Sequence, residues 1–383
     1  MIRFVENPTH GLDRDGNRDG GARTAEMRPP EGRAAETFKQ PQAGPNVREV
    51  RAGCIGRGHA GKTALFRALA EGPVGDFFPS GLHVDVGDPR EVARMIRETE
   101  ETQRILQASG LPPTLEASQI RYYLYDGDQQ CVVYKMREVI GQVLTHTLPD
   151  SAAEQQIRYE EYLKSLLNTH ALWTVIPCPP PNPSPRDRRR YANDLRITGA
   201  YLREALRLRP AEQPVSVALV LTKIDTLFRD EEEARAALGD EMLCGALGPL
   251  VHLSDKSARV AEAVIIPVTA FGFGNAVLRE ETGGRAEMAP SAPDDPFGPE
   301  AVWLLREGMP PLPYNLDTLV IWTLLFGLLG QERHGRPEEQ AKLTELTQML
   351  IDDLSAEDRW LVPLKGRLAS SPSEAGAHAP QTN

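Results

Sequence analysis

The residues from Gly56 to Thr63, GRGHAGKT, have the types and the spacing that bind phosphate groups. The run matches G-x-x-x-x-G-K-[ST] at every fixed position. Glycines let the backbone N–H groups of a tight loop converge on a phosphate, the lysine supplies charge, and the hydroxyl is placed to bind Mg²⁺. The motif predicts nucleotide-phosphate contacts from Gly56, Gly58, His59, Ala60, Gly61, Lys62, Thr63 and Ala64.

The sequence around this loop favours the phosphate-binding interpretation over an ordinary glycine-rich turn. Residues 47–55 form a β-branched run that is typical of a strand, and residues 63–70 are mostly good helix formers. A strand, a glycine loop and a helix in this order are the structural context that the motif requires.

A second set of residues predicts which base is bound. The apolar, strand-like run that begins at Val217 leads into Thr222, Lys223 and Asp225. A carboxylate at Asp225 can accept hydrogen bonds from both N1 and N2 of guanine, a pair of donors that adenine lacks. The stem of Lys223 would cover the purine face. The competing interpretation is a buried core strand with a polar end.

A further apolar run, 264–268, is followed by Thr269, Ala270 and Phe271. As at the first strand, a threonine follows the apolar residues, here with an alanine after it. We expect a backbone N–H group there to meet the guanine O6. The ligand is therefore expected to be GTP or GDP.

Together these residues resemble the translation-factor-like (TRAFAC) class of P-loop GTPases. The resemblance covers residues 48–272; Thr222 stands where Asn is usual, and Thr269-Ala270-Phe271 matches only part of the usual Ser-Ala-Lys. Within the class, the long insert before the hairpin looks like bacterial GTPases of multi-gene signalling or conflict systems, in some of which two GTPases act together.

The resemblance also implies two switch segments. Strands predicted at 120–125 and 131–134 flank Asp126-Gly127, a strong hairpin signal, and the class has a hairpin between its switches. Thr114, before the hairpin, then corresponds to the threonine that contacts Mg²⁺ and the γ-phosphate. Glu138 stands in for the metal-binding aspartate and Gln142 for the catalytic glutamine. The alternatives are a loop threonine and a solvated strand end.

The function expected from this resemblance is a GTP-hydrolysing regulatory switch. Lys62 and Mg²⁺, held by Thr63, Thr114 and Glu138, would neutralise charge, and Gln142 would orient the attacking water. Slow turnover is expected because no arginine finger can be assigned. Two alternatives stay open: a guanine-nucleotide-binding scaffold that does not hydrolyse, and an ATP-using P-loop enzyme. A protein effector or a second GTPase is the expected partner.

Composition sets limits that agree with this function. A net charge of −11 over 383 residues argues against nucleic acid as the main ligand. Four cysteines lie far apart, the N-terminus has no apolar signal segment, and the longest apolar run, 319–330, is shorter than the ~20 residues of a membrane span. We therefore expect a cytoplasmic protein with no transmembrane segment.

Along the chain, strands and helices alternate. This order predicts an α/β, three-layer P-loop NTPase fold, with a mainly parallel sheet, one antiparallel hairpin strand and helices on both faces. The expected divisions are a disordered tail (1–45), a GTPase domain (46–365) and a flexible tail (366–383). The domain is expected to contain a helical insert (82–110), a stiff proline run (178–185), a long loop (273–312) and C-terminal helices (314–330 and 336–354).

Overall fold

The structure, a computed structural model, describes residues 47–57, 60–71, 80–85, 119–126, 129–137, 152–178, 185–278, 303–306, 312–331, 337–356 and 358–365. All of them lie in one compact unit, Gln40–Asn383. The expected tails, most of the expected helical insert and most of the proline run fall outside these ranges.

Within the described ranges, eight strands form the main sheet, in the order β10-β7-β6-β5-β1-β4-β3-β2. The strands are β1 (Arg48–Ile55), β2 (Leu82–Asp85), β3 (Gln119–Asp126), β4 (Gln129–Arg137), β5 (Ala171–Pro177), β6 (Val215–Thr222), β7 (Val260–Pro267) and β10 (Val362–Lys365). The central pairs are parallel: Ala52 of β1 lies opposite Met136 of β4 and Ala171 of β5, and Leu219 of β6 lies opposite Ile265 of β7.

The expected α/β architecture is confirmed, and its antiparallel part is larger than expected. The hairpin β3–β4 is present, and β2 and β10 add antiparallel strands at the two edges of the sheet. The region expected as a helical insert, 82–110, begins with strand β2. The expected loop 273–312 contains a separate two-stranded hairpin, β8 (Ala276–Leu278) with β9 (Trp303–Leu305). Both differences are short strands whose partners lie far from them in the sequence, so composition alone did not reveal them.

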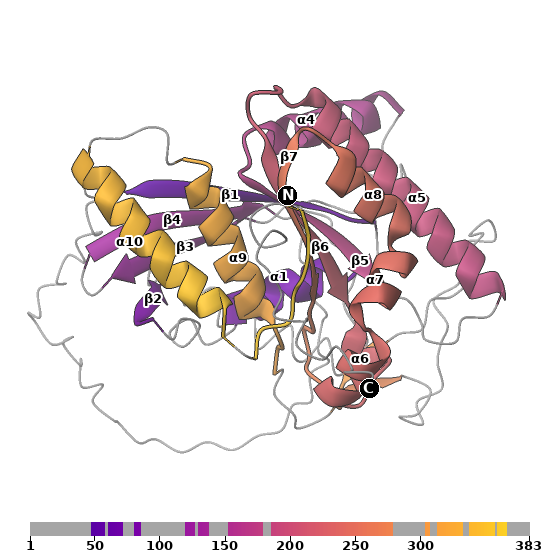
Figure 1. The fold of residues 1–383 in the computed structure, drawn as a ribbon. Coiled ribbons are helices and arrows are strands. Elements are labelled where there is room, and N and C mark those ends of the chain that lie inside the picture. The colour runs from indigo at the N-terminus through magenta and orange to yellow at the C-terminus, as the bar shows by residue number, and fades with distance from the viewer. Residues whose placement is uncertain are drawn as a thin grey trace, which may run out of the picture. The chain divides into compact units, whose positions relative to one another are not determined.

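Helices cover both faces of the sheet (Figure 1). One face packs against α1 (Lys62–Glu71), α9 (Leu316–Leu329) and α10 (Pro337–Leu354). The other packs against α4 (Ala152–Leu167), α5 (Pro185–Leu208), α6 (Glu231–Ala237), α7 (Asp240–Ala246) and α8 (Gly248–Lys256). Successive side chains of a strand point to opposite faces of the sheet. In β1, Val50, Ala52 and Cys54 belong to the first core and Ile55 belongs to the second.

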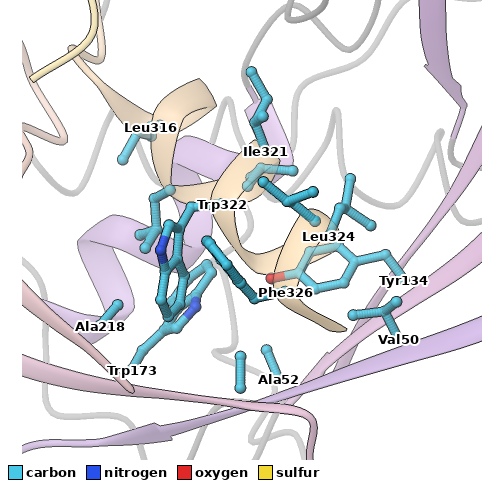
Figure 2. Close-up of a cluster of buried hydrophobic side chains, with 14 of the residues drawn as sticks. Val50, Ala52, Tyr134, Trp173, Ala218, Leu316, Ile321, Trp322, Leu324 and Phe326 are labelled. Carbon is cyan, nitrogen blue, oxygen red and sulfur yellow. The ribbon is translucent and has the colours of Figure 1, made fainter. Parts of the chain in front are cut away.

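Helix α9 forms the centre of the first core. Every residue from Leu316 to Leu328 except Asp317 is buried, and a helix that is apolar all round must be enclosed by protein or lipid. Figure 2 shows Trp322 and Phe326 of α9 beside Trp173 of β5 and Tyr134 of β4. The Trp173 Nε1 donates a 2.8 Å hydrogen bond to Thr323 Oγ1, which satisfies the indole inside the core. Among the described helices, none is long and apolar enough to cross a bilayer.

The contact between α9 and β1 gives a stability prediction. A Cβ atom at Gly327 would lie 2.5 Å from Val50 Cγ1, and the stiff valine cannot move away easily. We expect Gly327→Ala to lower the free energy of unfolding by about 1–3 kcal/mol, the usual cost of overpacking. Gly330→Ala, where the nearest atom is a helix carbonyl at 3.5 Å, is the control. Equal urea midpoints for the two variants would contradict the close approach.

Candidate functional site

The loop between β1 and α1 requires glycine at both fixed positions. A Cβ atom at Gly56 would lie 2.8 Å from the carbonyl oxygen of Val175 in β5. Gly61 has φ +82°, in the left-handed region, and a Cβ there would lie 3.2 Å from Thr222 Oγ1. Both glycines therefore allow the loop to lie against the carboxyl ends of β5 and β6.

Lys62 is the first residue of α1 and its side chain folds back over the loop. Its Nζ donates to the carbonyl oxygens of Gly56, at 2.8 Å, and Arg57, at 2.6 Å, and the residue is only 5% exposed. A buried ammonium group requires such partners. The N-terminus of the ten-residue helix α1, which also favours negative charge, lies at the same place. Cation and helix terminus together make this loop suited to an anion.

Thr222, the last residue of β6, ties this loop to the neighbouring strands. Its Oγ1 donates to the carbonyl oxygen of Ala60 at 2.7 Å, and its own carbonyl accepts from Cys178 N at 2.8 Å. Thr222 and Ala60 are 162 positions apart in the chain. The end of the predicted base-binding strand and the predicted phosphate loop are therefore in direct contact.

Asp225 follows through a sharp turn. Lys223 has φ 62° and leads into a short 3₁₀ helix, Ile224–Thr226, which turns Asp225 inward so that it is only 6% exposed. Its Oδ2 accepts a 3.3 Å bond from Phe271 N, and the backbone N–H of Gly272 also donates to the carboxylate. Burial raises the pKa of Asp225 to about 7, although these N–H groups act in the opposite direction.

Thr269, Ala270 and Phe271 lie in the loop that follows β7, and this loop faces Asp225. Thr269 is completely buried, and its Oγ1 accepts hydrogen bonds from Gly272 N, at 3.0 Å, and Tyr314 N, at 3.1 Å. The hydroxyl thus shapes a loop whose N–H groups point at the Asp225 carboxylate. A buried carboxylate beside backbone donors can take up the polar edge of a planar base.

The structure therefore brings together three of the predicted segments: the loop at 56–62, the end of β6 at 222–225, and the loop at 269–271. All three follow the carboxyl ends of parallel strands, where ligands bind in such sheets. Ala64 lies in the first turn of α1, and Thr63 beside it has a described backbone but no described side chain. Gly58, His59, Thr114, Glu138 and Gln142 lie outside the described residues.

Two contacts at the site were not predicted from the sequence. Arg57, within the predicted phosphate loop, forms an ion pair with Asp194 of α5, and Tyr314 holds the loop after β7. Asp194 and Tyr314 carry no local motif. Each is brought to the site by a separate element that is distant in sequence, so no spacing rule could have found it.

Comparisons with known proteins do not place this chain in a family. No protein-family model matches it, and the search of curated proteins finds no significant similarity. Function is therefore inferred from the geometry of the site.

Proposed function

We propose that this chain is a GTP-binding and GTP-hydrolysing switch of the P-loop type. The observation that carries the proposal is the meeting of three distant segments at one edge of the sheet. Thr222 Oγ1 joins the phosphate loop to the end of β6, and Phe271 N joins the loop after β7 to Asp225. A phosphate-binding loop and a buried base-reading carboxylate on adjoining segments are what a guanine nucleotide requires.

The residues present fit such a ligand. The loop has the two glycines, the helix N-terminus and the buried lysine that a polyphosphate needs. Asp225 is buried among backbone donors, and the N1 and N2 donors of guanine would complete the hydrogen bonds of its carboxylate. Adenine lacks this pair of donors, so it would leave the carboxylate oxygens without those hydrogen bonds and is expected to bind poorly.

Mg²⁺ belongs to the proposed activity. The proposed ligands are the Thr63 hydroxyl, Thr114 and Glu138, all of which lie outside the described side chains. When bound, the ion supplies electrostatic neutralisation of phosphate charge.

Catalysis would depend on positioning. Lys62 would stabilise charge on the transferring phosphoryl group, and Gln142 would orient the attacking water. Arg57 is the arginine of the loop, and its guanidinium is engaged by Asp194. That pairing supports slow turnover in the isolated chain, with a protein partner supplying acceleration.

Binding and single-turnover experiments on the full chain test the proposal. With Mg²⁺ present, we expect calorimetry to detect GDP and GTP binding at least about 100-fold tighter than ADP or ATP binding, because the buried carboxylate rejects adenine. We also expect slow conversion of GTP to GDP. Tight GTP binding without phosphate release would favour the scaffold alternative. Equal or tighter ATP binding would overturn the guanine assignment.

A further inference from the structure

The base-reading loop is held by a segment that lies outside the region of family resemblance. We infer that residues 312–315, here named the bracing segment, position the loop 269–272 and so set the selectivity for the 6-position of the purine. This inference rests on the proposed guanine nucleotide. It assigns to the C-terminal part of the chain a role in base selection.

Backbone hydrogen bonds join the two segments along their length. Thr269 N donates to the Tyr314 carbonyl at 3.1 Å, and Leu312 N donates to the Phe271 carbonyl at 2.8 Å. Tyr314 N also donates to Thr269 Oγ1, the atom that accepts from Gly272 N. The loop carries the N–H groups that face Asp225, so a shift of the bracing segment would shift those donors relative to the carboxylate.

Gly272 makes the fit between the two segments close. It has φ +90°, and a Cβ atom there would lie 2.2 Å from the carbonyl oxygen of Leu312. Any side chain at position 272 must therefore push the bracing segment and the loop apart. Gly274 offers a matched comparison, because it also has a positive φ, +74°, and the nearest atom to its Cβ position, the Arg229 carbonyl oxygen, is 3.9 Å away.

The bracing segment is itself fixed on its other side. Tyr314 Oη donates to Glu231 Oε1 at 2.7 Å and accepts from Arg235 of α6 at 2.9 Å. The Arg235 guanidinium lies over the Trp360 ring, 5.1 Å from its centroid. Asn315, with φ 60°, donates from Nδ2 to the carbonyl oxygens of Pro267 and Trp360, at 2.7 Å each. Because the bracing segment is anchored on this side, its hydrogen bonds to the loop 269–272 hold that loop in one position.

The consequence for recognition follows from the direction of the donors. Asp225 would read N1 and N2. Because Phe271 N and Gly272 N donate to Asp225, the N–H of Ala270 between the two ends of the loop would read O6. Selectivity for O6 requires this donor to stay at hydrogen-bonding distance from the base while the carboxylate keeps its own hydrogen bonds. The bracing segment would maintain this spacing, and Gly272 and Tyr314 would act as positioning residues.

The test compares GDP with 6-thio-GDP, in which a poorer acceptor replaces O6, by calorimetry with the full chain and Mg²⁺. We expect Gly272→Ala to reduce the preference of the chain for GDP over 6-thio-GDP by ~3–10-fold, the usual worth of one hydrogen bond. Tyr314→Phe should reduce it in the same direction. Gly274→Ala shares the backbone strain without the clash and should keep the parent preference. Tyr122→Phe is the control for Tyr314→Phe, because it also removes one tyrosine hydroxyl, here bonded to the Leu69 carbonyl in the other core. It should keep the parent preference.

The outcomes separate this inference from the proposed function. If the parent chain does not prefer GDP over ADP, the proposed function fails and the inference fails with it. If the parent prefers GDP and both Gly272→Ala and Tyr314→Phe keep the full preference over 6-thio-GDP, the bracing role alone is overturned. A lower thermal midpoint with unchanged preference would mean that the segment serves stability, and would also overturn it.

Discussion

Lys62→Ala is expected to abolish GTP hydrolysis and to weaken GTP binding by ~100-fold or more. Removing one charged donor that stabilises developing charge usually costs 10²–10³-fold in rate. Here the same side chain is also the buried cation of the loop, bonded to the carbonyl oxygens of Gly56 and Arg57. The variant therefore loses both the attraction for phosphate and the hydrogen bonds that Lys62 supplies to the loop backbone.

The measurement is phosphate release under single-turnover conditions, together with GTP titration by calorimetry. Lys256→Ala is the matched control, since Lys256 is an exposed lysine beside Asp255 at the end of α8 and should change neither quantity. If Lys62→Ala hydrolysed GTP at the parent rate, the loop would not be the phosphate site. If it bound no nucleotide and also failed to unfold cooperatively in urea, Lys62→Arg, which keeps the charge, would separate loss of fold from loss of ligand.

The glycine loop shows how local sequence can predict a structure. Gly56 and Gly61 were expected because a phosphate loop needs them, and the structure supplies the physical reasons: a carbonyl of β5 beside one and the Thr222 hydroxyl beside the other. Strand β6 was predictable in the same way, because all eight of its residues are apolar or small and all are buried. Local pattern and tertiary contact agree at these positions.

Edges and pairings of short strands were harder to predict. β2 has four residues and β8 and β9 have three each, so their stability depends on partners and not on their own composition. The bracing segment presents the same difficulty. Nothing near Tyr314 signals that it will meet Thr269, because the contact depends on where α9 begins after the β8–β9 hairpin.

Asp225→Asn is expected to exchange guanine preference for xanthine preference. An amide at this position can donate to the carbonyl at the 2-position of xanthine, whereas it repels the N2 amino group of guanine. We expect GDP affinity to fall by ~100-fold or more and XDP affinity to exceed it. Calorimetric titration with GDP and XDP measures both. Asp230→Asn is the control, because Asn caps the start of α6 as well as Asp does, and Asp230 accepts from Glu233 N at 2.8 Å.

The same substitution should stabilise the nucleotide-free chain. Burial raises the pKa of Asp225 to about 7 from 3.8, so the folded state holds a proton that the unfolded state has released between these pH values. Stability is therefore lost as pH rises toward 7, and an uncharged asparagine avoids this loss. At pH 8 we expect Asp225→Asn to raise the free energy of unfolding by ~1 kcal/mol or more, with a smaller gain at pH 5. Urea denaturation at both pH values provides the measurement.

These two effects of Asp225→Asn have opposite signs, and that opposition distinguishes a ligand-binding carboxylate from a structural one. If the carboxylate served only the fold, removing its charge would lower the free energy of unfolding of the chain, because the Phe271 and Gly272 N–H groups donate to it. A carboxylate kept buried at a cost in stability is explained by a ligand that needs its charge. A variant that is less stable at pH 8 and keeps the GDP preference of the parent would assign Asp225 to the fold and remove guanine from the proposal.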